Sequence, residues 1–233
     1  MERARIKSPR VIPGWSTNYQ SRHARAKPVK RRNAAETRQR ILDAAIKEFA
    51  AKGLDAARIE DITEQAGANR RMAYYYFGSK KGLYLAALEA SYLQLVEIEN
   101  TINVETLGPI EAIEAMIAAK FEHYLKHPQY VEFVKMENLY KARHLRMSRR
   151  IAEMRAPLIS IIQRALMRGE ELGIVRKGVD PLDLYLSICA LGFFVFSNQY
   201  TLNVIFDTDV TSRKALARRR RLVMDMIRAY LAP

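Results

Sequence analysis

The sequence predicts an all-α protein with an N-terminal three-helix helix-turn-helix module and a larger C-terminal helical bundle that dimerises. Apolar residues recur every three or four positions through most of the 233 residues, which is the period of a buried helix face. No segment alternates apolar and polar residues for long enough to indicate a strand. Gly, Pro, Asn and Ser also recur at the positions where helices begin and end.

Each helix is predicted from its own boundary signals. Asn33 begins a capping box with Glu36, and Gly53 is placed to end the helix that follows. Asn69 and Ser79 are predicted N-caps, and Pro157 is expected to kink the helix that contains it. The predicted helices cover residues 34–53, 59–66, 70–76, 80–102, 109–126, 128–140, 149–173, 181–206 and 212–231.

The charge is concentrated at the amino terminus. Of a net charge of +14, residues 1–33 hold ten basic residues and one acidic residue, a net of +9. We interpret residues 1–33 as a basic, disordered arm, residues 34–80 as the helix-turn-helix domain and residues 81–233 as the bundle. The single cysteine, Cys189, lies in an apolar run, and no stretch is a clean membrane span or a signal peptide. These features predict a cytoplasmic protein without a membrane partner.

Residues 59–80 carry the strongest functional signal. Gly67 permits the tight turn between two short helices, and the second of these begins with Arg70 and Arg71. Arginines at such a position reach guanine edges or phosphates, and outward tyrosines donate to phosphate oxygens. We expect Tyr74 and Tyr76 to face outward and Tyr75 to point into the module near Phe49 and Ile62. A purely structural interpretation, with a solvated arginine pair and packed tyrosines, is the alternative.

Three motifs resemble the tetracycline-repressor (TetR/AcrR) family of regulators. They are Thr-Arg-x-x-Ile-Leu-Asp-Ala-Ala-x-x-x-Phe-Ala-x-Lys-Gly over 37–53, Ile-x-x-x-Ala-Gly over 62–67, and Tyr-x-Tyr-Phe-x-Ser-Lys over 74–80. The resemblance implies a homodimeric transcription regulator, usually a repressor, that binds double-stranded DNA at a near-palindromic operator and responds to a small-molecule effector. Arg58, Met72 and Gly78 depart from common family residues. Carried over by position, the DNA contacts are Arg70, Arg71, Met72, Tyr74, Tyr76 and Lys80.

The bundle contains a helix that is apolar on nearly every side, predicted over residues 181–206. Such a helix must be buried on every side, so we expect one face to meet a second copy of the chain, with Ala190 and Gly192 allowing close approach. The last helix is expected to supply the other half of the interface. Its apolar residues at matching spacing are Leu216, Val223, Met226, Ile227 and Tyr230. The run 218–221 is expected to be a solvated basic face.

Effector-binding residues are predicted from aromatic and amide side chains on the expected inner faces of the bundle. Asn198 is the strongest candidate because a buried amide in an apolar run requires partners. The same residues are also consistent with ordinary core packing. The candidate set is Phe121, Tyr124, Phe133, Asn138, Phe194, Asn198 and Tyr200, with Glu137 and Tyr140 beside them.

The sequence offers no motif for catalysis, for a metal site or for a cofactor. The four histidines do not show metal-ligand spacing with Cys189 or with carboxylates, and there is no phosphate-binding glycine loop or nucleophile motif. Two other functions remain open. One is an architectural protein that binds DNA without sequence preference, and the other is a small-molecule-binding bundle with a vestigial DNA-binding module.

Overall fold

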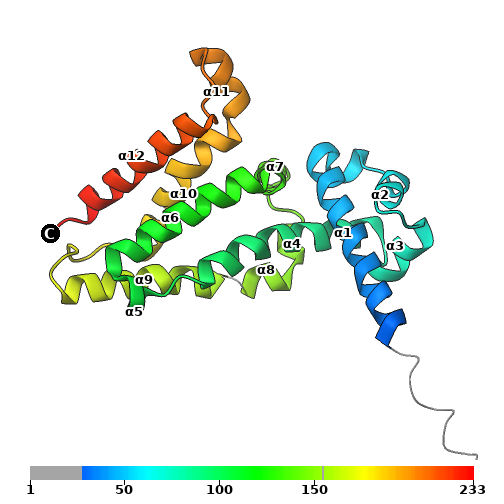
Figure 1. Ribbon diagram of the computed structural model, residues 1–233, viewed down its shortest axis with the longest axis horizontal. Helices are drawn as coiled ribbons and strands as arrows, with labels where there is room; N and C mark the ends of the chain where they lie inside the picture. The colour runs from blue at the N-terminus through cyan, green and yellow to red at the C-terminus, as the bar shows by residue number, and fades with distance from the viewer. Residues whose placement is uncertain (1–27, 154) are drawn as a thin grey trace, which may run out of the picture. The chain divides into compact units, whose positions relative to one another are not determined.

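The computed structural model describes residues 28–153 and 155–233, and within them the chain is helical with connecting turns (Figure 1). Residues from Thr37 to Pro233 form one compact unit. The helices are α1 (Pro28–Ala56), α2 (Ile59–Gln65), α3 (Arg70–Phe77), α4 (Lys80–Asn100), α5 (Val104–Leu107), α6 (Pro109–Lys126), α7 (Pro128–Leu139), the 3-10 helix η1 (Leu145–Met147), α8 (Arg149–Glu153), α9 (Arg155–Glu171), α10 (Pro181–Ser197), α11 (Gln199–Phe206) and α12 (Arg213–Leu231).

The predicted turn before α3 and the predicted caps of α3 and α4 are confirmed. Gly67 has a φ of 57° between α2 and α3, a conformation in which a side chain would be strained. The Asn69 side chain accepts a hydrogen bond from the Met72 amide at 3.0 Å and caps α3, and Ser79 caps α4 in the same way through the Gly82 amide. The position before α2, Arg58, has no side-chain cap. The helix-turn-helix therefore depends on Gly67 and Asn69 more than on a cap of α2.

The predicted start of the first helix is wrong. The helix α1 begins at Pro28, five residues before the expected cap at Asn33. Proline is compatible with the first turn because its missing N–H would have no intrahelical acceptor there. The rest of the basic arm, including Trp15, lies outside the described residues.

The long apolar helix predicted over residues 181–206 is two helices. The helix α10 ends at Ser197, and α11 leaves it at an angle of 69°. The Ser197 hydroxyl and the Asn198 amide both donate to the Phe194 carbonyl, at 3.3 and 3.0 Å, and such local bonds compete with helix continuation. Of the helix predicted over 149–173, the structure describes α8 and α9, and residue 154 between them lies outside the described residues.

Two hydrophobic cores share the helix α4. The amino-terminal core joins α1, α2 and α3 to the first half of α4, including Leu83 and Leu88. The second core joins α6, α9, α10 and α12 to the second half of α4 through Leu95. The helix α7 contributes to both, with Phe133 in the first and Val131 in the second. Two helices, α4 and α7, therefore link the helix-turn-helix to the bundle.

Glu137 fixes the loop after α7 to α4. Its buried carboxylate accepts hydrogen bonds from the Tyr84 hydroxyl at 3.1 Å and from the His144 and Leu145 amides at 3.1 and 3.0 Å, and it lies 2.7 Å from His144 Nδ1. The loop passes through two residues of positive φ, one of them Lys141. A carboxylate that satisfies so many donors holds this loop in a single arrangement.

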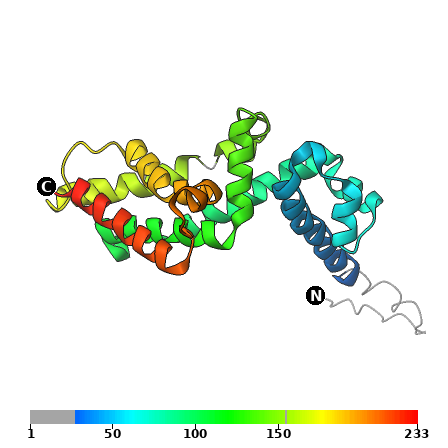
Figure 2. The same ribbon diagram turned by 90° about the horizontal axis from the view of Figure 1, so that it is seen from above.

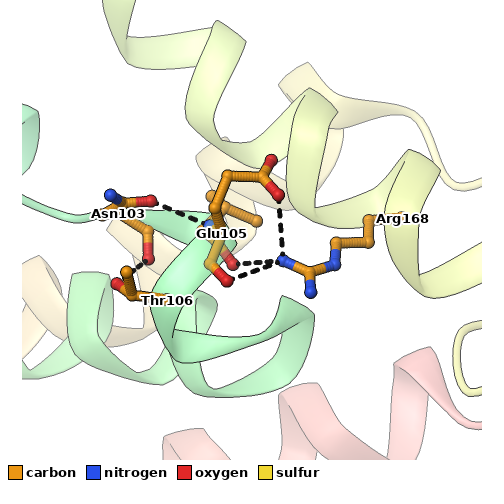
Figure 3. Close-up of polar contacts among 5 residues, drawn as sticks. Asn103, Glu105, Thr106 and Arg168 are labelled. Carbon is orange, nitrogen blue, oxygen red and sulfur yellow. Dashed lines mark hydrogen bonds and ion pairs between the residues drawn. The ribbon is translucent and has the colours of Figure 1, made fainter.

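Arg168 makes a similar connection inside the bundle (Figure 3). Its Nη1 atom donates to the Val104 and Glu105 carbonyls at 2.9 and 3.1 Å and lies 3.2 Å from Glu105 Oε2. The Asn103 side chain caps the short helix α5 by accepting a hydrogen bond from the Glu105 amide. The helix α5, which the sequence did not predict, is thereby joined to α9.

Figures 1 and 2 both show α12 beside α10 and α6, and contacts between α12 and each of these helices agree with that arrangement. Within the described residues, no single helix is long and apolar enough to cross a membrane, and α10 with α11 passes that test only as a bent pair. In the same part of the chain, no three His, Cys, Asp or Glu side chains gather as metal ligands would.

Candidate nucleic-acid interface and effector cavities

The exposed face of α3 consists of two arginines and two tyrosines. Arg70, Arg71, Tyr74 and Tyr75 are all exposed, and Tyr75 is the most exposed of the large apolar or aromatic side chains on this helix, at 81%. Positive charge and hydroxyl donors are therefore presented together on one short helix whose N-terminus follows the Gly67 turn. Such a face suits contact with the phosphates and base edges of a DNA groove.

The predicted orientation of the tyrosines is wrong at two positions. Tyr75 points away from the core, whereas Tyr76 and Met72 are half-buried and pack against the amino-terminal core. The register is set by Ala73, which is 2% exposed, so residues three and four positions from it share its inward face. The inward pair is Tyr76 and Phe77, and Tyr75 is carried to the opposite side.

Arg70 is held at the start of α3 by two neighbours. Its Nη1 atom lies 2.8 Å from Glu60 Oε1 on α2, and its guanidinium lies 5.4 Å from the centre of the Tyr74 ring. Both members of the ion pair are more than half exposed, so the pair contributes little to stability and exchanges readily for another anion. Arg71 beside it is exposed.

Lys80 has a contact within the chain in addition to its predicted contact with DNA. Its ammonium donates to the Asp55 carbonyl at the end of α1, at 3.0 Å, and the residue is half-buried. Lys81 next to it is exposed. The first turn of α4 therefore holds one lysine tied to α1 and a second on the surface, with its backbone amides available to an anion.

Two cavities lie among the bundle helices near the predicted effector residues. One, of about 340 Å³, lies between α6, α7 and α10. The other, of about 390 Å³, lies between α6 and α12 and is bounded by charged residues that include Glu122 and Arg220. More aromatic rings line the first cavity than the second. Its lining residues are Tyr124, Tyr130, Val134, Cys189, Ala190, Phe193, Phe194 and Ser197.

The structure brings only some of the predicted effector residues together. Tyr124 and Phe194 line the 340 Å³ cavity, and Phe121 lines the 390 Å³ cavity. Phe133 is fully buried in the amino-terminal core instead. Asn138 is exposed and donates to the Val134 carbonyl, Asn198 donates to the Phe194 carbonyl, and Tyr200 is 69% exposed. Glu137 is buried near the end of α7, and Tyr140 directly follows that helix.

Sequence reasoning did not find Tyr130, Val134, Phe193 and Cys189 as cavity residues. Phe193 and Cys189 are four residues apart on α10, so their shared face was visible in the helical spacing. Nothing in the sequence shows that this face meets α7, because that contact depends on how the helices pack.

An apolar stripe runs along the outer side of α10 and α12. On α10, Leu182, Leu186 and Phe194 recur at multiples of four residues and are each about half exposed, with exposed Ala190 between them. On the neighbouring α12, Leu222, Met226 and Tyr230 recur in the same way and are 42–47% exposed. We call these seven residues the outer stripe.

Four residues predicted for the dimer surface face the chain's own core. Leu216, Val223 and Ile227 are at most 7% exposed within the bundle core. Gly192 is buried against α6, where an added Cβ would lie 3.2 Å from the Phe121 ring. The exposed residues Leu222 and Met226 directly precede the buried residues Val223 and Ile227 on α12. In the basic run, Arg219 donates to the Leu191 carbonyl while Arg218, Arg220 and Arg221 are exposed.

A buried ion pair lies behind the 340 Å³ cavity. Lys120 Nζ is 2.5 Å from Glu99 Oε1, and the two side chains are 2% and 0% exposed. The ammonium also donates to the Tyr185 hydroxyl at 3.1 Å and contacts the Cys189 thiol, which lines the cavity. Burial raises the pKa of the Cys189 thiol, and the Lys120 ammonium opposes that shift. The thiol therefore stays protonated at neutral pH.

His123 is buried on α6 beside His127 and Tyr130, with ring centres 4.7 and 5.0 Å away. Burial lowers its pKa to about 4, assisted by His127 and Lys120. Between pH 6.5 and pH 4 the unfolded chain binds a proton that the folded chain does not, so stability should fall as the pH falls through this window. We expect a loss of roughly 2–3 kcal/mol by pH 4. The loss is measured by urea unfolding of the natural protein and of the His123→Phe variant at several pH values. The same dependence of the unfolding free energy on pH in both proteins would contradict the assignment to His123.

Two family models match different parts of the chain. The family model described as bacterial regulatory proteins, tetR family, matches residues 41–87, and the tetracyclin repressor-like C-terminal domain matches residues 109–227. The HTH-type transcriptional repressor NicS of Pseudomonas putida is 30% identical over 198 residues, which span 85% of this chain and 93% of that protein. The HTH-type transcriptional regulator RutR of Escherichia coli O157:H7 is 31% identical over 69% of this chain and 74% of its own length.

Solved structures share the fold. The ketosteroid transcriptional regulator KstR2 of Mycobacterium tuberculosis superposes with a TM-score of 0.62 at 20% identity, covering 84% of this chain and 95% of that one. The hemolysin II transcriptional regulator HlyIIR gives 0.59 at 20% identity, covering 86% and 99%. The helix-turn-helix of α2 and α3, the helical bundle and these matches agree, and the chain belongs to the tetR family of DNA-binding transcription regulators.

Proposed function

We propose that this protein is a repressor that binds a near-palindromic operator as a homodimer and is released by a small-molecule effector bound in the bundle. The observation that carries the proposal is the exposed face of α3, where Arg70, Arg71, Tyr74 and Tyr75 stand together on a helix braced by α2. NicS, a relative along most of both chains, is named as a repressor. Such a regulator acts where the chromosome is, so we place its action in the cytoplasm.

The proposed contacts divide into base reading and backbone positioning. Arg71, exposed near the N-terminus of α3, is assigned to a base edge, and Arg70 to a base or phosphate after it leaves Glu60. Tyr74 and Tyr75 are assigned to phosphates through their hydroxyls. Met72 and Tyr76 hold α3 in place from partly buried positions, and Lys80 ties the start of α4 to α1. Lys80 or Lys81 adds positive charge beside the DNA.

The outer stripe is the proposed dimer surface. Single exposed apolar side chains are common on protein surfaces, but seven apolar residues on two neighbouring helices form a patch. Such a patch marks a surface that is covered by a partner surface of the same apolar character. A two-fold contact brings the same residues of both subunits together. Two α3 helices on such a dimer would meet two half-sites of a near-palindrome.

The proposed effector site is the 340 Å³ cavity. Its wall includes Tyr130 and Val134 of α7, and the same helix places Phe133 in the amino-terminal core and Glu137 against Tyr84 of α4. A movement of α7 on effector binding would therefore reach both α4 and the helix-turn-helix. The effector shifts the equilibrium only if it binds the released arrangement more tightly than the DNA-bound one.

DNA binding by α3 is tested by comparing single substitutions on a fixed operator fragment. Arg71→Ala should cost roughly 1–3 kcal/mol of binding free energy and relax the preference for particular bases. Tyr75→Ala should weaken binding to every sequence without loss of stability, since Tyr75 is exposed. The matched control is Arg164→Ala, which removes an exposed arginine from α9 and should leave affinity unchanged.

The measurement is fluorescence anisotropy with DNA from the region flanking the gene, and with a scrambled duplex, at several salt concentrations. Equal affinity for both duplexes with a steep salt dependence would instead identify an architectural DNA binder. Unchanged affinity in Arg71→Ala and Tyr75→Ala would contradict the assignment of α3 as the reading helix.

A further inference from the structure

Four of the eight residues that line the 340 Å³ cavity are aromatic. The rings of Tyr124 and Tyr130 are nearly parallel, 8° apart with centres 5.9 Å from each other, and Phe193 meets Tyr124 edge-on at 5.5 Å. Polar groups at the wall are few, and they include the Cys189 thiol and the Ser197 hydroxyl. A cavity of this size and lining takes a small, flat, largely apolar molecule with one or two hydrogen-bonding groups.

Two of the residues around this cavity also belong to the outer stripe. Ala190 and Phe194 line the cavity, yet both are exposed and Phe194 is 52% exposed. They continue the series of Leu182 and Leu186 at four-residue spacing along α10. The rim of the cavity and the proposed dimer surface are therefore one continuous piece of α10.

We infer that a second copy of this chain closes the cavity, so that each effector site is composed of one subunit's cavity and the partner's outer stripe and takes a small aromatic molecule. The inference rests on the proposed function, which supplies the dimer. A single subunit leaves the rim at Ala190 and Phe194 open to water, whereas a ligand site of this kind buries most of its ligand.

The second copy is the occupant that the surface fits. The rim continues into exposed leucines of α10 and then to Leu222 and Met226 of α12, so whatever covers the stripe also covers the rim. Two-fold symmetry then closes both cavities in the same way. An effector that touches both subunits binds one arrangement of the dimer more tightly than another, which is the differential affinity that release from DNA requires.

The reaction rate of the Cys189 thiol measures how far the second subunit closes the cavity, because Cys189 lines the cavity and is the only cysteine of the sequence. The full-length protein is reacted with 5,5′-dithiobis(2-nitrobenzoic acid) as the dimer and as the Leu186→Glu variant, in which a charge placed on the stripe should separate the subunits. The thiol of the separated subunit should react at least about tenfold faster. Met167→Glu, an equally exposed position on α9, should keep the slow rate, and Cys189→Ser should not react.

Dilution of the natural protein supplies a second reading if Leu186→Glu fails to fold, as judged by circular dichroism. The rate per subunit should rise as the dimer dissociates. A rate that is the same in dimer and separated subunit would overturn the composite site while leaving DNA binding and the dimer intact. A Leu186→Glu variant that stays dimeric would overturn the composite site together with the proposed dimer surface.

The ligand class is tested by a thermal-shift screen of one- and two-ring aromatic compounds against aliphatic compounds of equal size. Aromatic compounds should raise the melting temperature of the dimer and slow the labelling of Cys189. Stabilisation by aliphatic compounds alone would contradict the assigned class.

Discussion

Replacement of Lys120 by methionine is expected to destabilise the folded protein by about 3–5 kcal/mol, because it leaves the Glu99 carboxylate buried without its counter-charge. The two groups are 2.5 Å apart and almost fully buried, and Glu99 Oε2 lacks a hydrogen-bond partner among the described residues. Removing one member of such a pair costs far more than the pair itself contributes. Urea unfolding at a fixed protein concentration measures the change, since dimer formation makes stability concentration-dependent.

The matched control is Lys126→Met on the same helix. Lys126 pairs with Glu122 at 2.7 Å, but both side chains are more than half exposed, so its loss should cost about 1 kcal/mol or less. The double variant Lys120→Met with Glu99→Leu should recover most of the lost stability. A Lys120→Met protein within about 1 kcal/mol of the natural one would mean that water or another group already satisfies Glu99.

Leu186→Glu is expected to lower the affinity for a two-half-site operator by at least about a hundredfold, because a separated subunit binds only one half-site. Leu186 lies in the middle of the outer stripe on α10 and is 53% exposed, so its substitution does not disturb the chain's own core. Sedimentation velocity and anisotropy on the same preparation report subunit association and DNA affinity together.

Met167→Glu is the control for this prediction as well. Met167 is 56% exposed on α9, a helix that carries none of the outer stripe, and the variant should remain dimeric and bind the operator normally. Gly192, which the sequence placed at the interface, packs against Phe121 instead, so its substitution would disturb the subunit itself. A Leu186→Glu protein that sediments as a dimer would contradict the assigned surface.

The helices themselves were predictable because their boundaries depend on local chemistry. Asn69 and Ser79 each cap a helix where the sequence places a cap, and Pro109 begins α6 as expected. The errors lie where side chains override a simple pattern. Asn198 ends α10 inside an apolar run that reads as continuous, through bonds to the Phe194 carbonyl.

The face of α3 was misjudged because three consecutive tyrosines give no apolar contrast to set the register. Ala73, four residues before Phe77, is the signal that would have set it, since a small residue allows α3 to approach the core. A similar signal was available for Lys120, which shares helical spacing with Met116, Ile117 and Tyr124 and is buried with them.

The proposed effector cavity was less predictable than the exposed face of α3. The residues of α3 lie on a single short helix, so their common exposure follows from one register. The cavity is assembled from three helices, and the neighbours of Cys189 on α6 and α7 are set by packing that no local pattern specifies. Phe133 illustrates the difference, because its position on α7 was correct but it faces the amino-terminal core.

The central claim, that the exposed face of α3 reads DNA on a two-fold dimer, is tested most directly by binding stoichiometry and specificity on DNA that flanks the gene. The account predicts one dimer on a near-palindromic site, bound at least about a thousandfold more tightly than a scrambled duplex, with that preference reduced by Arg71→Ala. A single subunit in solution that binds both duplexes equally would contradict it.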